Sequence, residues 1–525
     1  MENTKGILIG GGVTALLVGL LFGTGVIRVG GQATEEEASE EESAEVAPPQ
    51  GQRRRRKGRK GRRRRKGKAG QLDSLAYLGE IPLTDETRNK SGVTIHDPSA
   101  SDGLFLANIA GGGNTGRRRR TQRVREAVLW DASGKKLNTW SSSALSAHRS
   151  WAMTRLDDDG YLYVVVADRG LLKLDWASNE VWSVRGRLHH DFTLLDDGRV
   201  AVLAERRIVA DAPEALGEDA SVRLLDHGVV FLDEDGTVME EVWLYESFKD
   251  HPTFQDRFLR GVEAKKDRVL VEEGDAERPG GLDTFHANSI VILPRDIEGL
   301  GKAGDLLLSF RHMSTVACVS HTTKEVLWSW GSDDLVRQHD ATPTADGKVV
   351  LFDNRTKEDL SRVVVVDPKT NAIVRTIGGR QAKPELQFFS MGRGLAQELD
   401  NGNIMVVVSN EGRAFEVTAN DDIVWEFWSP WMGKDVRRPF RGVRIEGAHQ
   451  ERIQAIVSGS VPQPVVPEGY QPHHADLGAS GVDDDDEDEE SGASDDELAP
   501  DEEPEKPQPE TKPTGQDTPV PPSPQ

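Results

Sequence analysis

The middle of the chain repeats one pattern of apolar and polar positions. An apolar strand is followed by a turn at Asp or another polar residue, and then by a strand that usually carries Trp. Six copies of this pattern begin at Ala127, Leu171, Val229, Val316, Val363 and Ala414. Their turns contain Asp-Gly, Asn-Asp or Pro-Lys, which are typical of hairpins. Each copy is therefore predicted to form a β-hairpin.

A second predicted hairpin precedes most of these copies. Its mark is a polar turn followed by an apolar run, and it occurs at Asp158, Asp196, Ala303, Asp346 and Asn401. Two hairpins per repeat make four strands, which is one propeller blade. The predicted fold is all-β, a six-bladed β-propeller with four-stranded antiparallel blades. Residues 245–266 break the strand pattern and are predicted to be a helical insertion between the third and fourth repeats.

The two ends of the chain differ in pattern from the middle. The segment Gly6–Ile27 is apolar and uncharged, and about 20 such residues span a bilayer. A retained transmembrane anchor is predicted, with an uncleaved or cleaved signal peptide as the alternative. The predicted organisation is an anchor at 1–28, a disordered acidic and then Arg/Lys-rich linker at 29–71, the propeller at 72–466, and a disordered acidic, Pro-rich tail at 467–525.

The charge and the cysteine content of the chain exclude few classes of function. The net charge of −23 comes mainly from the ends, so it says little about a substrate. The run Arg53–Lys68 is a solvated tether or binds an anionic surface such as lipid headgroups. Nucleic acid is not expected as a partner, because no aromatic residues interleave with these charges. The single cysteine, Cys318, excludes a disulfide framework and lies in an apolar strand pattern.

Histidines stand at matching places in different repeats. They precede apolar runs at His148, at His189 and His190, at His286 and at His339. In a propeller, the innermost strands line the central axis, so side chains at the starts of these strands converge. A single histidine there is usually a core residue, but this repetition favours a functional site on the axis.

An arginine among these histidines suggests the charge of the ligand. Arg311 ends the apolar run LLLSF and offers a planar fork of donors to an anion. Imidazole can act as a nucleophile, a donor or a proton shuttle. A metal site formed by the histidines is the less favoured alternative, because the arginine favours an anion. Neither a metal nor a cofactor is predicted. His312 is expected to point away from Arg311, since neighbouring strand residues face opposite sides.

Four segments carry a resemblance to a known family. They read HHDFTLLDDG, FHANSI followed by LLLSFRH, QHDATPTADGKVVLFDNR and LDNGNIMVVVSNEGRAFEV. Together, over roughly His189 to Trp428, they resemble the arylsulfate sulfotransferases, a family of bacterial six-bladed propellers. The resemblance implies transfer of a sulfuryl group from a phenolic sulfate ester to a phenolic acceptor, without a nucleotide sulfate donor. It also implies a periplasmic or other extracytoplasmic location for a propeller anchored to the membrane.

The resemblance assigns roles to individual residues. It implies that His339 is the nucleophile that forms a sulfohistidine, and that His190, His286 and Arg311 complete the catalytic group. The residues expected to bind substrate are His189, Asn288 and Asn354. The two amides could also fix the tautomers of the histidine rings, or serve only as hydrogen-bonding groups at turn ends.

The sequence also departs from the family. Asp340 stands where the family often has a small hydroxyl residue, and it would orient His339 or repel the anion. The disulfide of many family members cannot form with one cysteine. The alternative function is a non-catalytic, membrane-anchored propeller that uses the same pocket to bind a sulfated or other anionic ligand.

Overall fold

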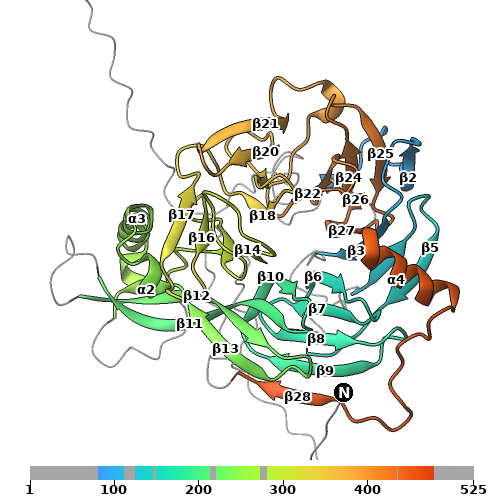
Figure 1. Cartoon of the computed structure of the whole chain (residues 1–525). Coiled ribbons are helices and arrows are strands. Elements are labelled where there is room, and N and C mark those ends of the chain that lie inside the picture. Colours follow the sequence, from blue (N-terminus) through green and yellow to red (C-terminus); the bar gives the residue numbers. More distant parts are fainter. Residues whose placement is uncertain are drawn as a thin grey trace, which may run out of the picture. The chain divides into compact units, whose positions relative to one another are not determined.

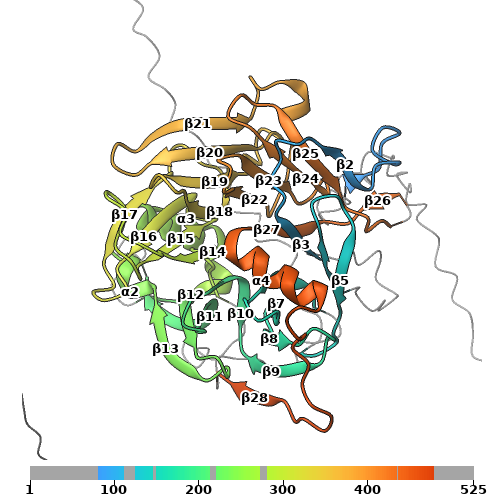
Figure 2. The same ribbon diagram turned by 45° about the vertical axis from the view of Figure 1, so that its right-hand side comes forward.

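Six antiparallel sheets follow one another around a central axis (Figure 1), so the predicted six-bladed propeller is confirmed. The structure is a computed structural model and describes residues 81–110, 125–145, 149–212, 220–271, 281–433 and 435–477. The innermost strands begin near the axis, and the outer strands form the rim (Figure 2).

Each blade has four strands, which are numbered below in their order from the axis outward. Blade 1 consists of β27 (Phe440–Ile445), β3 (Leu104–Ile109), β4 (Ala127–Trp130) and β5 (Lys136–Trp140). Blade 2 consists of β6 (Trp151–Leu156), β7 (Leu162–Val166), β8 (Gly170–Leu174) and β9 (Glu180–Arg185). Blade 3 consists of β10 (Leu188–Leu194), β11 (Val200–Asp211), β12 (Ser221–Leu232) and β13 (Val238–Trp243).

The other three blades repeat this order. Blade 4 consists of β14 (Ala287–Ile292), β15 (Leu306–Phe310), β16 (Thr315–Val319) and β17 (Val326–Trp330). Blade 5 consists of β18 (His339–Pro343), β19 (Val349–Asp353), β20 (Arg362–Asp367) and β21 (Ala372–Gly378). Blade 6 consists of β22 (Leu395–Glu398), β23 (Ile404–Val408), β24 (Arg413–Val417) and β25 (Ile423–Trp428), with β2 (Gly92–His96) at its outer edge.

The predicted hairpins occupy the predicted places. All six Trp-type repeats form the two outer strands of a blade, and the second hairpins form the two inner strands. Strands Val349–Asp353 and Ile404–Val408, in the middle of their blades, are buried along their whole length, and all of these residues except Asp353 are apolar. A strand packed between two neighbouring blades has no solvent face, so its sequence loses the alternation of a half-exposed strand.

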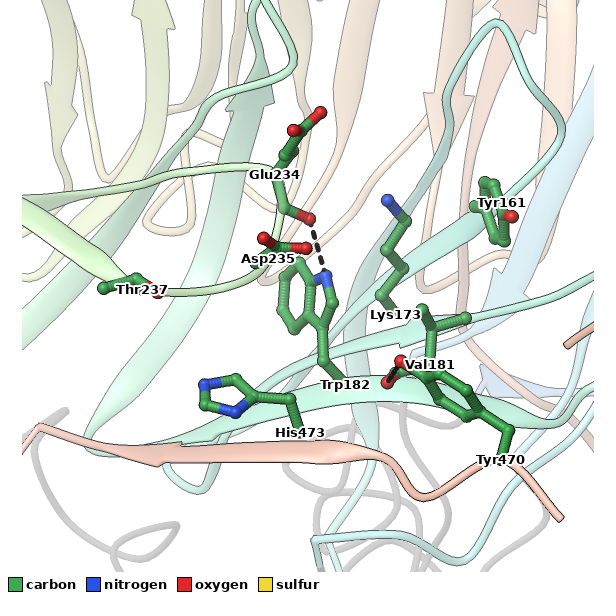
Figure 3. A pocket seen from close by; sticks show the side chains of 9 residues that line it. All are labelled: Tyr161, Lys173, Val181, Trp182, Glu234, Asp235, Thr237, Tyr470 and His473. Atoms are coloured by element: carbon green, nitrogen blue, oxygen red, sulfur yellow. Dashed lines mark hydrogen bonds between the residues drawn. The ribbon is translucent and has the colours of Figure 1, made fainter.

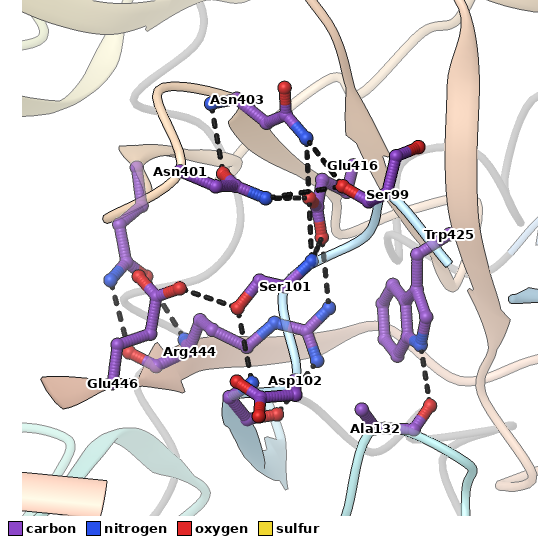
Figure 4. Close-up of polar contacts among 12 residues, drawn as sticks. Ser99, Ser101, Asp102, Ala132, Asn401, Asn403, Glu416, Trp425, Arg444 and Glu446 are labelled. Carbon is purple, nitrogen blue, oxygen red and sulfur yellow. Dashed lines mark hydrogen bonds and ion pairs between the residues drawn. The ribbon is translucent and has the colours of Figure 1, made fainter. Parts of the chain in front are cut away.

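The recurrent tryptophans join neighbouring blades at four of the six junctions. Trp182 of blade 2 donates its indole N–H to the carbonyl of Glu234, in the outer turn of blade 3, at 2.8 Å (Figure 3). Trp425 of blade 6 reaches Ala132 of blade 1 in the same way, also at 2.8 Å (Figure 4). Equivalent bonds run from Trp140 to Asp175 and from Trp328 to Asn371. A buried indole needs a partner for its N–H, and the neighbouring turn supplies it.

The ring closes between blades 6 and 1. Strand β27, from the end of the propeller sequence, becomes the innermost strand of blade 1 and pairs with β3. Arg444 of β27 pairs with Glu416 of blade 6 at 3.4 Å and stacks on the Trp425 ring at 4.1 Å (Figure 4). Ser101 and Asn403 donate to Glu416 at 2.9 and 2.7 Å. This closure was not part of the sequence prediction.

Additional elements lie outside the blades. The predicted insertion is helical, as α2 (Tyr245–Phe248) and α3 (Pro252–Val269) show. Helix α4 (Gly447–Ser458) follows β27, and the short elements are β1 (Ile81–Pro82), η2 (Pro384–Leu386) and β26 (Val436–Arg437). Strand β28 (His473–Asp476) pairs in parallel with β9 and adds a fifth strand to the sheet of blade 2, so regular structure continues past residue 466, the predicted end of the propeller.

The predicted anchor Gly6–Ile27, the basic run Arg53–Lys68 and residues 478–525 lie outside the described residues. Among the helices that the structure does describe, none is long and apolar enough to cross a membrane.

We predict that Arg444→Met lowers the free energy of unfolding by about 3 kcal/mol, because it leaves Glu416 buried without its cation. Equilibrium unfolding in urea measures the change. Lys383→Ala, which removes an exposed partner of Asp422 at 3.1 Å, is the control and should cost less than about 1 kcal/mol. Equal losses in the two variants would contradict a special role for the closing ion pair.

Candidate active site

The predicted site histidines lie where the innermost strands begin, whereas Arg311 and Asn354 directly follow the second strands β15 and β19. His189 and His190 are on β10, His286 directly precedes β14, and His339 is the first residue of β18. Each of these strands carries a register irregularity at this point. His190 has φ 57° and His286 has φ 47°. A bulge that contains a residue in the left-handed backbone conformation changes the direction of the side chains next to it. Imidazoles of neighbouring blades can therefore point toward one another.

His339 is held as one defined tautomer. Its Nδ1 lies 2.7 Å from Oδ1 of Asn354. The Asn354 amide nitrogen donates to the carbonyls of Ser390 and Arg393, each at 2.7 Å, so Oδ1 must be the acceptor. His339 therefore carries its proton on Nδ1 and its lone pair on Nε2. That lone pair accepts the backbone N–H of Arg393 at 3.1 Å.

The surroundings of His339 favour the neutral ring. Its side chain is buried, and burial lowers its pKa well below the usual range. Arg311 and Arg441 lower this pKa further, because a second positive charge nearby is unfavourable. Arg441 lies on β27 and donates to the backbone carbonyl of His190 at 3.0 Å. A neutral imidazole among guanidinium groups can attack an anion that those groups attract.

Asn288 supports this strand from blade 4. Its amide donates to the carbonyl of Gln338 at 2.8 Å, one residue before His339. The Gln338 amide in turn donates to Ser309, Phe310 and Thr315 at 2.9–3.2 Å. Asn288 thus fixes the start of β18 against blade 4, and its role in binding substrate stays a prediction.

Asp283 joins three histidines and was missed by the sequence prediction. Its carboxylate lies 2.7 Å from Nδ1 of His286 and 3.0 Å from Nε2 of His227, and its backbone carbonyl lies 2.8 Å from Nδ1 of His312. Burial alone would raise the pKa of Asp283, but these histidines hold it well below its usual range. The carboxylate is therefore ionised, and it orients His286. The sequence signal is its place three residues before His286.

The expected direction of the His312 side chain is wrong. Nε2 of His312 lies 3.1 Å from the Arg311 guanidinium, and its ring lies 4.4 Å from the ring of His286. Strand β15 ends at Phe310, so the two residues belong to a turn and the alternation of a strand does not apply to them. Since Nδ1 donates to the Asp283 carbonyl, Nε2 accepts a hydrogen bond from Arg311 and positions it.

His189 and His190 form a pair. Their Nδ1 atoms lie 2.8 Å apart, so one ring donates to the other. The ring of His190 also lies 4.9 Å from that of His286, which links blade 3 to blade 4. Burial lowers the pKa of His190 well below its usual range, and His286 and His189 add to the effect. The structure thus brings His190 into the group of His286, whereas His148 lies outside the described residues.

Asp340 does not orient His339. Both nitrogens of His339 have other partners, and the Asp340 carboxylate accepts the backbone N–H of Ala396 at 2.9 Å. Burial and the nearby Asp191 raise the pKa of Asp340 to about 7. A carboxyl that is half protonated near neutral pH repels an anion less than a full charge would.

A separate cavity lies at the rim (Figure 3). It has a volume of about 510 Å³ and is lined between blades 2 and 3 by side chains that include Lys173, Glu234 and Tyr470. None of the predicted site residues lines it.

We predict that Asp340→Asn flattens the pH dependence of stability. The carboxyl titrates near 3.8 when unfolded and near 7 when folded, so its stabilisation is complete below about pH 4 and lost as pH rises through 7. The variant should therefore gain stability relative to the native chain between about pH 4 and pH 8. Urea unfolding across this range measures the difference. The exposed control Asp422→Asn should follow the native curve, and a native-like slope in Asp340→Asn would refute the assignment.

Comparisons with known proteins identify the family. No curated protein matches the sequence. Among solved structures, a Bacteroides caccae protein of unknown function is 10% identical, with a TM-score of 0.41 over 65% of this chain and 99% of that one. A streptogramin B lyase is also 10% identical, with a TM-score of 0.35 over 70% and 96%. A sequence model described as arylsulfotransferase (ASST) matches residues 154–430, more than half of the chain. The chain belongs to the arylsulfotransferase family.

Proposed function

We propose that the protein transfers a sulfuryl group from a phenolic sulfate ester to a phenol through a sulfohistidine at His339, without a nucleotide donor. The observation that carries the proposal is the hydrogen bond from His339 to Asn354, which leaves the lone pair on Nε2. Family membership supports sulfotransferase activity in general. The phenolic substrates and the covalent intermediate belong to the proposal.

In the first half-reaction, Nε2 of His339 attacks the sulfur of the ester. The N–S bond forms, the bond between sulfur and the aryl oxygen breaks, and the phenolate leaves with the electron pair. The backbone N–H of Arg393, 3.1 Å from Nε2 in the resting site, gives up this contact and becomes a donor for a sulfuryl oxygen. In the second half-reaction a phenol attacks the sulfur, and the electron pair returns to Nε2.

His286 transfers the proton to the phenolate and from the phenol. Its Nδ1 donates to the ionised Asp283, and its side chain is 25% exposed, more than the buried rings of His339 and His189. A carboxylate behind an imidazole stabilises the imidazolium form. His286 gives a proton to the departing phenolate and takes one from the incoming phenol, so the site is restored after each cycle.

The guanidinium groups of Arg311 and Arg441 bind the sulfate ester. Arg311 and Arg441 both lower the pKa of His339, so their positive charge acts at the nucleophile and would attract the sulfuryl oxygens. His190 is neutral in the free site and contributes an N–H donor rather than a charge.

The direct test is a covalent one. Incubation with a 4-substituted phenyl sulfate should release phenol and add one sulfuryl group to His339, as seen by intact mass and peptide mapping. His339→Ala should lose the adduct and lower kcat by roughly 10³-fold or more. His321→Ala is the control, because His321 pairs with Glu240 on the surface, away from the axis.

The possible results separate the two functions. Phenol release without an adduct on His339, or with an adduct elsewhere, would contradict the mechanism. Ligand binding with neither phenol release nor an adduct would support the non-catalytic propeller.

His312 provides a second test. We predict that His312→Ala lowers kcat/KM for the donor about 10- to 100-fold, because Arg311 loses its charge-assisted acceptor. His312→Gln, whose amide oxygen can still accept from Arg311, should recover part of the loss. Steady-state kinetics with circular dichroism as a folding check measures both. Full activity in His312→Ala, or equal losses in the two folded variants, would refute the positioning role.

A further inference from the structure

Three potential metal ligands lie on adjacent strands of blade 3. Glu205 on β11 and His227 on β12 are direct cross-strand partners. The backbone N–H of Glu205 donates to the carbonyl of Arg187, two residues before His189 on β10. Cross-strand neighbours on one face of a sheet are close enough to share a ligand. One nitrogen of each histidine and one oxygen of Glu205 all lie within 4.8 Å of one another.

Both imidazoles keep one buried nitrogen without a partner. Nδ1 of His189 contacts His190, and Nε2 of His227 contacts Asp283. Nε2 of His189 and Nδ1 of His227 have no hydrogen-bond partner in the described part of the chain. These residues are only 2% and 1% exposed. Buried polar atoms are almost always paired, so these two unpaired nitrogens indicate an additional ligand.

A second group of similar residues is less suited to a cation. Asp283, His286 and His312 also lie within 4.8 Å of one another. However, His286 already donates to Asp283, and both nitrogens of His312 are held by the Asp283 carbonyl and by Arg311. His312 therefore has no nitrogen left to bind an ion. This group therefore serves the anion site.

We propose that His189, Glu205 and His227 bind a divalent transition-metal ion of the zinc class. Two imidazoles and one carboxylate are a donor set for zinc that leaves a fourth position for water. Zinc ligands lie about 2.0–2.2 Å from the ion. One donor atom of each of the three residues already lies within 4.8 Å of the other two, so small side-chain rotations bring the donors into range.

Outer contacts hold the ligands in place. Arg187 pairs with Oε1 of Glu205, and Asp283 pairs with His227, which is how second-shell groups orient ligands. Since His189 contacts His190 at 2.8 Å, the bound ion positions a residue of the proposed transfer site. The ion itself lies beside the group that receives the anion.

The test uses the full chain, stripped of metal with a chelator and titrated with Zn²⁺ alone. Calorimetry and metal analysis after dialysis should give one zinc ion per chain. Glu205→Gln and His227→Gln should lose this zinc, while Asp283→Asn should weaken its binding by roughly 10- to 100-fold. His321→Gln is the matched control, because His321 and Glu240 form a similar pair, 2.9 Å apart, on the surface. Circular dichroism establishes that each variant is folded.

The readout does not depend on sulfuryl transfer, so it stands apart from the proposed function. Visible absorption of the Co²⁺-substituted chain should report imidazole ligation and disappear in His227→Gln. The proposal is overturned if the native chain binds no zinc, or if folded Glu205→Gln and His227→Gln bind zinc as the native chain does. It is also overturned if His312→Gln abolishes binding while His227→Gln retains it, since the ion would then belong to the other group.

Discussion

The contact between the outer strand of one blade and the outer turn of the next is the interaction on which the structure depends. Four of the six junctions use a Trp indole N–H for it. Between blades 5 and 6, Arg375 donates to the carbonyl of Thr418. Between blades 3 and 4, Lys324 pairs with Glu240. The same position thus carries a directional contact at every junction, although the chemistry changes.

The rim contacts also affect the axis, because the middle strands of each blade are largely buried and connect the outer strand to the innermost one. If the rim contacts fix the angle between blades, they also fix where the innermost strands begin. The proposed site needs that accuracy, since His190, Asp283 and His339 come from three different segments and act through contacts of 2.7–3.1 Å. Strand β27, which closes the ring of blades, brings Arg441 to the same site, where it donates to the carbonyl of His190.

The site has two neighbouring regions, one that favours an anion and one that favours a cation. Around His339, guanidinium groups and a neutral imidazole favour an anion. One blade away, Glu205 and Asp283 face His189 and His227, and these carboxylates favour a cation. Asp283 contacts both regions, with one oxygen on His286 and the other on His227. A single buried carboxylate thus couples the orientation of the two groups.

The sequence by itself determined the blades and the chain positions of the histidines. Hairpin turns and buried apolar runs are local signals, and the six-fold repetition placed His190, His286 and His339 at matching strand starts. Tertiary structure alone decided which way those side chains point. Side chains alternate between the two faces of a sheet only within a regular strand. The strand starts carry bulges, and β15 ends at Phe310, so the contact between His312 and Arg311 could not be predicted. Likewise, the contact between Asp283 and His227 and the pairing of Glu205 with His227 depend on loop geometry and strand register. Contacts between distant segments cannot be read from the periodicity of the sequence.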